Sequence, residues 1–487
     1  MADANSKMNL RLSDIALMLG LQPPVADPKV DRVGIDSRTT ESGDIFLALS
    51  GERFDGHDFL AQAKAAGASA AIVERLVDDV DLPQLQVTDA HAVLTDLARA
   101  WRNRLDIKII GVTGSNGKTG VKEMLRTVLG RKAPVFATRG NLNNDIGVPL
   151  NLLSLRPGHA FAVIEMGASA AGEIDHLSRI VRPDVAVITN ASAAHLAGFG
   201  TVKAVARAKG EIFSGLGPDG IAVINHDDPH VGVWWHMAGN HKHLGFALQH
   251  DAHVRAECVH LNGLDGSRFI LVTPSGSCEV RLPLPGEHNV ANALAVAAAA
   301  HACGFSPDAI AGGLAAVSGV PGRLQIHHLD NGAILIDDSY NANPRSLAAA
   351  IRVLNSAGRQ RCWLVLGDMG ELGASDRAMH AQVGREAGME GVERIYAVGS
   401  LSEAAVEAFA GDGWVFHDHE ALTRAIRDDL EGSMVPEEIV VLVKGSRASH
   451  MERVIGPLLD SVEPNSISVA NVTTLPTDNG GPTCCSM

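Results

Sequence analysis

The chain has 487 residues, of which 46% are hydrophobic and 20% charged; this composition is typical of globular proteins, and the length suggests about three domains. Its formal net charge of −15 argues against general binding to nucleic acid or anionic membranes, because both need clustered Lys and Arg. The six cysteines follow no disulfide or metal-site spacing, and we expect neither a signal peptide nor a membrane span, so the sequence predicts a cytoplasmic protein.

Residues 1–90 predict a small α/β domain. Short apolar stretches bounded by turn residues indicate strands, and an Ala-rich stretch near 59–66 indicates a helix. The predicted strands cover 33–38, 44–49 and 70–74.

Residues 91–320 predict a larger domain around a parallel sheet. Continuous apolar strands alternate here with helical stretches, which is typical of a sheet buried on both faces. At 252–284 turns separate alternating strands, so we expect a small antiparallel patch there. The predicted parallel strands cover 107–112, 135–138, 161–165, 185–189 and 221–225.

Residues 321–462 return to the strand–helix alternation and predict a Rossmann-like, doubly wound domain. Its predicted strands cover 333–337, 362–367, 394–398 and 439–444. Residues 463–487 are polar and rich in Gly, Pro and Thr, which predicts a disordered tail. The expected fold is therefore α/β, with a small N-terminal domain, a central parallel-sheet domain with a phosphate-binding loop, and a C-terminal Rossmann-like domain.

The segment IIGVTGSNGKTG, from Ile109 to Gly120, has the parts of a phosphate-binding loop. A buried strand leads into a Gly-rich turn, and a helix predicted from about 119 to 129 directs its positive end at the same point. The usual spacing is not kept, because Val112 stands five positions before Gly117, where a glycine is common. An ordinary strand–helix turn is the alternative. The residues expected to bind phosphate are Gly114, Ser115, Asn116, Gly117, Lys118 and Thr119.

The form Thr113–Thr119 resembles the TG-x-NGKT loop of the Mur ligase family, whose members form amide bonds at the expense of ATP. The resemblance implies ATP as cosubstrate and two Mg²⁺ ions, held by Thr119, Glu165, His195 and Lys209. Glu165 ends an apolar strand beside the loop, where a Mg²⁺ ligand is expected, although a solvated strand-end carboxylate is the alternative. By position alone His195 could be structural. In the family the lysine matching Lys209 is carbamylated, whereas an unmodified surface lysine is the default.

Further segments resemble the family's ATP site. His288, Asn289 and Asn292 open an alanine-rich helix and either cap it or contact adenine. Arg323 lies at the junction to the third domain, where it can reach phosphate when the domains close. The resemblance implies catalytic roles for Lys118, Lys209, His195 and Arg323. Asp338 is expected to hold the ribose or to orient Asn341.

The stretch DDSYNANP, 337–344, resembles the family members that add D-alanyl-D-alanine to UDP-N-acetylmuramoyl-tripeptide. Two more loops, 140–149 and 366–373, agree with this resemblance. Arg345 departs from it, since we expect an acidic residue there. The residues implied for the dipeptide are Tyr340, Asn343, Glu371, Lys444 and Arg447; a basic helix start is the alternative for the last two. The residues implied for the UDP substrate are Asp36, Ser37, Arg38, Phe54, Asp55, Gly56, His57, Asn141, Asn143 and Asn144.

The resemblance therefore predicts a monomeric bacterial ligase of peptidoglycan synthesis, acting on ATP, UDP-N-acetylmuramoyl-tripeptide and D-alanyl-D-alanine through an acyl phosphate. A sister ligase or a folylpolyglutamate-type ligase that adds one amino acid is the nearest alternative, and DDSYNANP argues against both. A P-loop kinase would need a hydroxyl acceptor site and has no need of the third domain. A nucleotide-binding regulator without catalysis is the alternative of another class. The sequence leaves open whether the third residue of the tripeptide is diaminopimelate or lysine.

Overall fold

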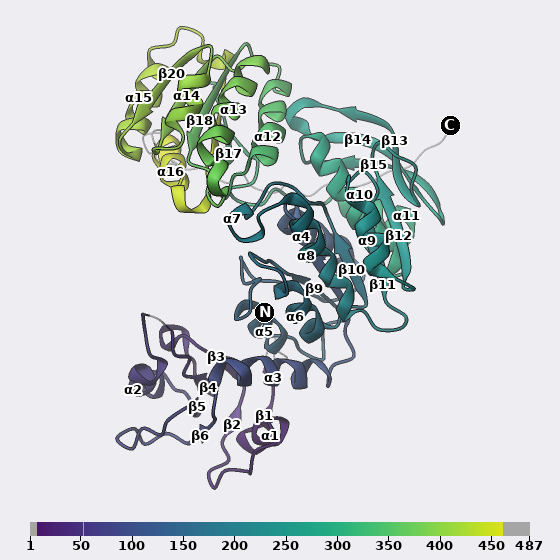
Figure 1. The fold of residues 1–487 in the computed structure, drawn as a ribbon, viewed down its shortest axis with the longest axis vertical. Coiled ribbons are helices and arrows are strands. Elements are labelled where there is room, and N and C mark those ends of the chain that lie inside the picture. The colour runs from purple at the N-terminus through teal and green to yellow at the C-terminus, as the bar shows by residue number, and fades with distance from the viewer. Residues whose placement is uncertain (1–6, 52, 461–487) are drawn as a thin grey trace, which may run out of the picture.

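The computed structural model describes residues 7–51 and 53–460 of the chain. The described chain forms three large sheets, which follow one another along the sequence (Figure 1). Each predicted domain range contains one of these sheets, and the domain boundaries themselves stay predictions. The predicted disordered tail lies outside the described residues.

The N-terminal unit contains a four-stranded parallel sheet in the order β3-β4-β5-β6. Its three predicted strands and its helix are confirmed with shorter bounds, and β6 was not predicted. A two-stranded antiparallel ribbon, β1 with β2, precedes the sheet. The elements are β1 (Leu10–Arg11), α1 (Leu12–Met18), β2 (Lys29–Val30), β3 (Arg32–Gly34), β4 (Asp44–Leu47), α2 (Leu60–Ala65), β5 (Ala70–Val73) and β6 (Gln84–Gln86).

Helix α3 (Ala90–Arg102) follows the N-terminal sheet and packs its buried side chains into a core shared with the middle unit. Trp101 on α3 is only 4% exposed, and its indole N–H donates to the Leu155 carbonyl at 3.0 Å, just beyond α5 (Gly147–Leu153). One hydrophobic core contains buried residues of both units. The N-terminal unit is therefore anchored on the middle unit through α3.

The middle unit has a nine-stranded sheet in the order β15-β14-β13-β12-β11-β10-β7-β9-β8. The predicted antiparallel patch is confirmed as β13, β14 and β15, but it extends the main sheet, since β13 pairs in parallel with β12. β12 itself was not predicted. The strands are β7 (Lys108–Thr113), β8 (Val135–Ala137), β9 (Phe161–Glu165), β10 (Val185–Ile188), β11 (Ile221–Asn225), β12 (Lys242–Ala247), β13 (Val254–Leu261), β14 (Ser267–Thr273) and β15 (Gly276–Leu282).

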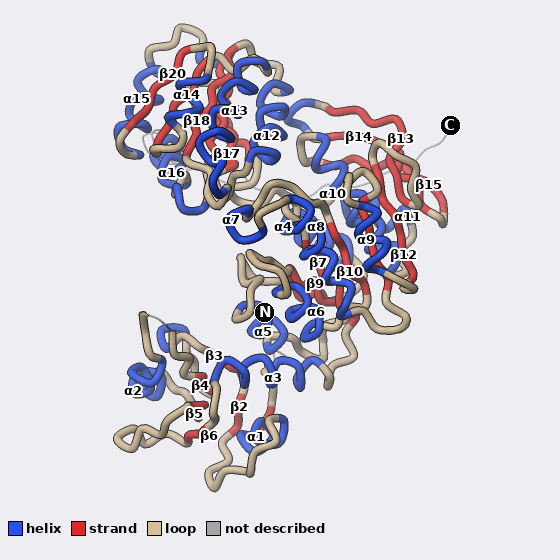
Figure 2. Tube along the Cα trace, viewed as in Figure 1, coloured by secondary structure: helices blue, strands red, loops and turns tan. Residues whose placement is uncertain are grey.

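Helices cover both faces of this sheet, as Figure 2 shows. Alternate residues of the central strands face two separate hydrophobic cores. Because both faces of these strands are buried, their sequences are continuous apolar runs. One core takes α4 (Lys118–Gly130), α10 (Glu287–Ala302) and α11 (Pro307–Leu314); the other takes α5, α6 (Glu173–Val181), α8 (Val202–Gly210) and part of α9 (Val231–Ala238). The short helix α7 (Leu196–Phe199) follows His195.

The C-terminal unit is a six-stranded sheet in the order β16-β17-β21-β18-β19-β20, parallel except for β16. Helices flank both faces, so the predicted doubly wound architecture is confirmed; edge strands β16 and β20 were not predicted. The strands are β16 (Gln325–His328), β17 (Ile334–Asp338), β18 (Arg361–Gly367), β19 (Arg394–Val398), β20 (Asp412–Phe416) and β21 (Ile439–Lys444). The helices are α12 (Pro344–Ser356), α13 (Asp376–Met389), α14 (Glu403–Ala408), α15 (His419–Glu431) and α16 (Glu452–Asp460).

The N-terminal and C-terminal units lie at opposite ends of the middle unit (Figure 1). The carboxyl end of β7 and the start of α12 meet between the middle and C-terminal units. Within the described residues no helix is long and apolar enough to cross a membrane.

We predict that Trp101→Ala lowers the free energy of unfolding by about 3–5 kcal/mol, because it removes a buried indole at the junction of two units. Trp235→Ala is the matched control: Trp235 is 47% exposed, and its loss is expected to cost less than about 1 kcal/mol. Denaturant unfolding of both variants measures the difference. Equal losses would show that α3 does not anchor the N-terminal unit.

Candidate active site

The predicted phosphate loop connects β7 to α4 and depends on two glycines. Gly114 has φ 148° and Gly117 has φ 82°, a region that favours glycine. A Cβ on Gly114 would lie 1.9 Å from Thr189 Oγ1, and one on Gly117 would lie 2.4 Å from Asn292 Oδ1. Glycine is therefore required at both positions by the backbone conformation and by the close neighbours.

The segment after β10, residues 189–192, holds this loop in place, and we call it the brace. Thr189 Oγ1 donates to the Asn116 carbonyl at 2.6 Å. The Ser115 N–H donates to the Asn190 carbonyl at 3.0 Å, and the Ser192 N–H donates to Ser115 Oγ at 3.0 Å. The brace fixes the loop through hydrogen bonds to Ser115 and Asn116.

Lys118 is folded back onto the loop. Its Nζ donates to the Gly114 carbonyl at 2.7 Å and to the Ser115 carbonyl at 3.4 Å. Burial lowers the pKa of Lys118 and Arg323 adds to that shift, whereas Glu165 opposes it. A phosphate at the loop would offer this ammonium a stronger acceptor than a carbonyl.

Thr119, Glu165 and Arg323 form one network at the start of α4. Thr119 Oγ1 donates to Glu165 Oε2 at 3.0 Å, and Arg323 Nη2 donates to Thr119 Oγ1 at 3.0 Å. Asn143, predicted to bind the UDP substrate, donates from Nδ2 to Glu165 Oε1 at 2.8 Å. The sequence-predicted hydroxyl and carboxylate are thus adjacent, as oxygen ligands of Mg²⁺ need to be.

His195 contacts the C-terminal unit. Its backbone is left-handed, with φ 54°, and Nδ1 lies against the Glu371 carboxylate. Burial lowers the pKa of His195 while Glu371 opposes the shift. Glu371, predicted for the dipeptide, therefore engages a predicted metal ligand in this arrangement.

Lys209 is a buried cation, only 1% exposed. Its Nζ lies 3.5 Å from the Ala168 carbonyl and 5.7 Å from the Phe199 ring centre, and no ion pair within the described chain includes it. Burial lowers the pKa of Lys209 to about 7, and repulsion from Lys118 adds to that shift. The alternative of a solvated surface lysine is wrong.

The start of α10 lies beside the loop. Asn289 Nδ2 donates to the Pro285 carbonyl at 2.8 Å, and Asn292 Nδ2 donates to Asn289 Oδ1 at 3.3 Å. Burial, reinforced by Lys444 and Arg352, lowers the pKa of His288 to about 4. The helix begins after Gly286 without a side-chain cap, so the alternative of capping by Asn289 is wrong, and Asn292 is the residue of this group that lies against the loop at Gly117.

The segment 337–344 faces the loop from the C-terminal unit. Asn343 caps α12 through Ser346, and its Nδ2 donates to Asn116 Oδ1 at 2.7 Å. Tyr340 lies against two cations, with its ring centre 4.4 Å from Arg323 Cζ and 5.8 Å from Arg447 Cζ. The structure thus brings Asn343 and Tyr340 to the phosphate loop.

Lys444, predicted for the dipeptide, bonds to neighbours within the C-terminal unit. It is buried and paired with Asp338, and its Nζ also donates to the Asn341 carbonyl at 2.9 Å. Burial raises the pKa of Asp338 while Lys444 opposes the shift. Arg447 instead pairs with Glu452 at 3.2 Å.

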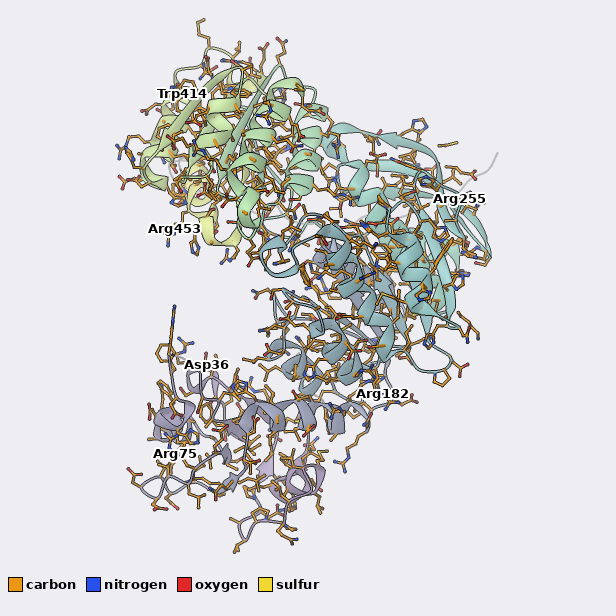
Figure 3. All side chains as sticks on the ribbon, viewed as in Figure 1. Asp36, Arg75, Arg182, Arg255, Trp414 and Arg453 are labelled. Atoms are coloured by element: carbon orange, nitrogen blue, oxygen red, sulfur yellow. The ribbon has the colours of Figure 1, made fainter. Side chains whose placement is uncertain are left out.

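The residues predicted for the UDP substrate in the N-terminal unit lie apart from the phosphate loop, and Figure 3 shows Asp36 in that unit. Asp36 pairs with Arg38 at 2.7 Å, Ser37 Oγ donates to Gln62, and Phe54 is 72% exposed. Asp55 accepts from His57 and Arg75, and these hydrogen bonds outweigh burial and lower the pKa of Asp55. A Cβ on Gly56 would lie 2.7 Å from Ala48 Cα.

The loop 140–149 lies on the middle unit. Asn144 Oδ1 accepts from the Gly147 N–H at 2.9 Å at the start of α5, and the Asn141 carbonyl accepts from the Asn143 N–H at 2.8 Å. Asn143 links this loop to the predicted metal ligand Glu165 through its side-chain amide. The loop is thereby tied to the phosphate site, whereas the N-terminal substrate residues are not near it.

Sequence reasoning missed the residues that hold the phosphate loop through hydrogen bonds, either directly or through the brace: Asn190, Ser192, Asn225 and Asp228. Asn225 Nδ2 donates to the Thr189 carbonyl at 2.7 Å, and Asp228 Oδ2 accepts from the Ala191 N–H at 2.8 Å. Asn225 ends β11 and Asp228 follows it at the carboxyl edge of the sheet, so the position of polar residues at the end of a buried strand was the available signal.

The fold and site define a class: a nucleotide-dependent α/β protein whose phosphate loop is covered by a C-terminal doubly wound unit. Three family models match, described as Mur ligase family, catalytic domain, over 29–102; Mur ligase middle domain over 112–300; and Mur ligase, glutamate ligase domain, over 322–447. The chain belongs to the Mur ligase family.

Several relatives that are similar along nearly the whole chain share one name. The chain is 43% identical over 455 residues to UDP-N-acetylmuramoyl-tripeptide–D-alanyl-D-alanine ligase of Escherichia coli (strain K12), covering 93% of this chain and 99% of that protein. Among solved structures it is similar to MurF from Acinetobacter baumannii, at 39% identity and TM-score 0.87, covering 93% and 100%. MurF ligase from Thermotoga maritima in complex with ADP has 30% identity and TM-score 0.78, covering 88% and 97%.

We predict that Gly117→Ala weakens ATP binding by at least about tenfold, because alanine strains a left-handed position and its Cβ meets Asn292 Oδ1. Gly120→Ala, one turn along in α4, is the control, since its Cβ would meet only Asn292 Nδ2 at 3.6 Å. The control is expected to retain ATP affinity and to stabilise the helix by about 1 kcal/mol. Calorimetric titration with MgATP measures both; unchanged affinity in Gly117→Ala would contradict the loop assignment.

Proposed function

We propose that the chain is an ATP-dependent ligase that joins D-alanyl-D-alanine to the terminal carboxylate of UDP-N-acetylmuramoyl-tripeptide. The product is the UDP-muramoyl-pentapeptide precursor of peptidoglycan. One observation carries the proposal: the segment 337–344, which resembles the dipeptide-adding ligases, contacts the phosphate loop directly through Asn343 and Asn116. The E. coli relative of that name, similar along almost the whole chain, supports it.

The chemistry requires activation of a carboxylate, because its oxide is a poor leaving group. The tripeptide carboxylate attacks the γ-phosphorus of ATP and ADP leaves; the dipeptide amine then attacks the acyl phosphate carbonyl, and phosphate leaves with formation of the amide. Lys118 and Arg323, which both lie at the loop, reduce the repulsion between the carboxylate and the phosphates. Docking of the C-terminal unit keeps water from the acyl phosphate.

The residues around the loop fit Mg²⁺. Thr119 and Glu165 offer adjacent oxygens, and the buried Lys209, once carbamylated, would add an anion beside His195. Two ions held by these residues would neutralise the phosphate charge.

We propose that the three units bind different substrates or parts of substrates. Asp36–Arg38, 54–57 and 140–144 receive the UDP substrate, and α10 with 337–341 receives the nucleoside of ATP. The candidates for the dipeptide are Tyr340, Asn343, Glu371, Lys444 and Arg447; Lys444 and Arg447 would have to exchange their carboxylate partners, Asp338 and Glu452, for the dipeptide. We propose a monomer in the bacterial cytoplasm.

The substrate assignment predicts that phosphate release from MgATP requires both substrates together. Omitting the UDP-muramoyl-tripeptide or D-alanyl-D-alanine in turn should abolish release, and mass spectrometry should find the pentapeptide. Lys118→Ala should lower kcat by about 10³, the scale of losing a key charge contact, while Lys108→Ala at the exposed start of β7 should not. Release with a single amino acid in place of the dipeptide would instead indicate a sister ligase.

Carbamylation of Lys209 predicts dependence on carbon dioxide. A neutral amine is needed for this reaction, and a pKa of about 7 leaves roughly half of the lysine neutral at pH 7. Removal of dissolved carbon dioxide should lower activity and bicarbonate should restore it. Lys209→Arg should be inactive under both conditions, whereas Lys203→Ala, on the exposed face of the same helix, should respond as the wild type does. Full activity without carbon dioxide would exclude the modification.

A further inference from the structure

The first turn of α12 carries a cation that local electrostatics does not favour. Arg345 directly follows Pro344, the first residue of the helix, and the first turn contains no acidic residue. The positive end of a helix dipole favours anions, so an arginine here is unfavourable unless something else holds it. Its Nη1 donates to the Ala191 carbonyl at 3.3 Å, across the interface between the C-terminal and middle units.

The residue whose carbonyl receives this bond, Ala191, is also held through its N–H. Its N–H donates to Asp228 Oδ2 at 2.8 Å, and Asp228 is 2% exposed. The second carboxylate oxygen of Asp228 accepts from the His230 N–H at 2.9 Å. Arg345 therefore contacts a carbonyl that is already held in position by the middle unit.

Ala191 is one residue from the contacts that fix the phosphate loop. Ser192 donates its N–H to Ser115 Oγ at 3.0 Å, and its own Oγ accepts from Asn116 Nδ2 at 2.9 Å. Two residues before Arg345, Asn343 donates to Asn116 Oδ1 at 2.7 Å. The start of α12 thus holds both the loop and the brace behind it.

We propose that Arg345 is a positioning residue that seats the C-terminal unit on the brace and so keeps the phosphate loop in its binding conformation. It touches the Ala191 carbonyl rather than the reacting atoms. Docking of the unit that brings the dipeptide is thereby coupled to the order of the loop that holds ATP. The inference deepens the proposed function and rests on it for its kinetic consequence, while the structural coupling is independent of the substrate's identity.

The test compares Arg345→Ala, Arg345→Lys and Arg385→Ala in the full chain. Arg385 is an exposed arginine on α13 and serves as the control. We expect Arg345→Ala to lower kcat about tenfold, the scale of losing a hydrogen bond from a charged donor, with the KM for D-alanyl-D-alanine and the Tm unchanged. Arg345→Lys should recover part of the loss, because a lysine keeps a charged donor, and Arg385→Ala should match the wild type.

Hydrogen–deuterium exchange with a non-hydrolysable ATP analogue and Mg²⁺ gives a second measurement. Backbone amides of 114–119 and 189–192 should exchange faster in Arg345→Ala than in Arg385→Ala. Unchanged exchange and unchanged kcat in Arg345→Ala would overturn the proposal. A lowered kcat that is accompanied by a lowered Tm would also overturn it. A raised dipeptide KM with unchanged exchange would also overturn it and place Arg345 on the substrate. If the wild type releases no phosphate with both substrates, the proposed function fails, and the exchange data alone decide the role of Arg345.

Discussion

The site depends on the pairing of β7 with β10. Because these parallel strands are hydrogen-bonded neighbours, the segments that leave their carboxyl ends run side by side. The phosphate loop uses that neighbour as a support: Thr189, Asn190 and Ser192 all hydrogen-bond to it, and the Thr189 side chain occupies the space that any side chain at 114 would need. A loop with two left-handed glycines is thus held in one conformation by protein contacts.

Charge around this loop has the sign opposite to that of the whole chain. The protein carries a net charge of −15, yet Lys118, Lys209 and Arg323 converge where the middle and C-terminal units meet. Burial lowers the pKa of both lysines; Arg323 adds to the shift of Lys118, and Lys118 adds to the shift of Lys209. Anionic ligands relieve the repulsion among these cations, and an acidic surface leaves the cationic site as the favoured place for them. The distribution of charge therefore favours anionic ligands at this site.

Much of the fold could be predicted because the central strands are buried on both faces. β9, β11, β19 and β21 have the predicted bounds, and each is a nearly unbroken apolar run. The strands that escaped prediction lie where burial is incomplete: β16 consists of Gln-Ile-His-His, and β20 has exposed Trp414 and Val415. The packing of α3 between the N-terminal and middle units was also beyond sequence reasoning, because a core shared through Trp101 leaves no mark in composition or periodicity.

The sequence offered candidate site residues along each segment, but it did not reveal their partners across segments. Lys444 shows why. Its place after the apolar run of β21 suggested a free cation for a carboxylate, but in the sheet β21 lies between β17 and β18, and the register sets Lys444 directly opposite Asp338. Only the strand order creates that ion pair, and strand order is not encoded in local pattern. The pair also fixes the Asn341 carbonyl, and so shapes the turn that carries Asn343 to the phosphate loop. Lys444, predicted to bind the dipeptide, is thus also an internal support of the segment 337–344.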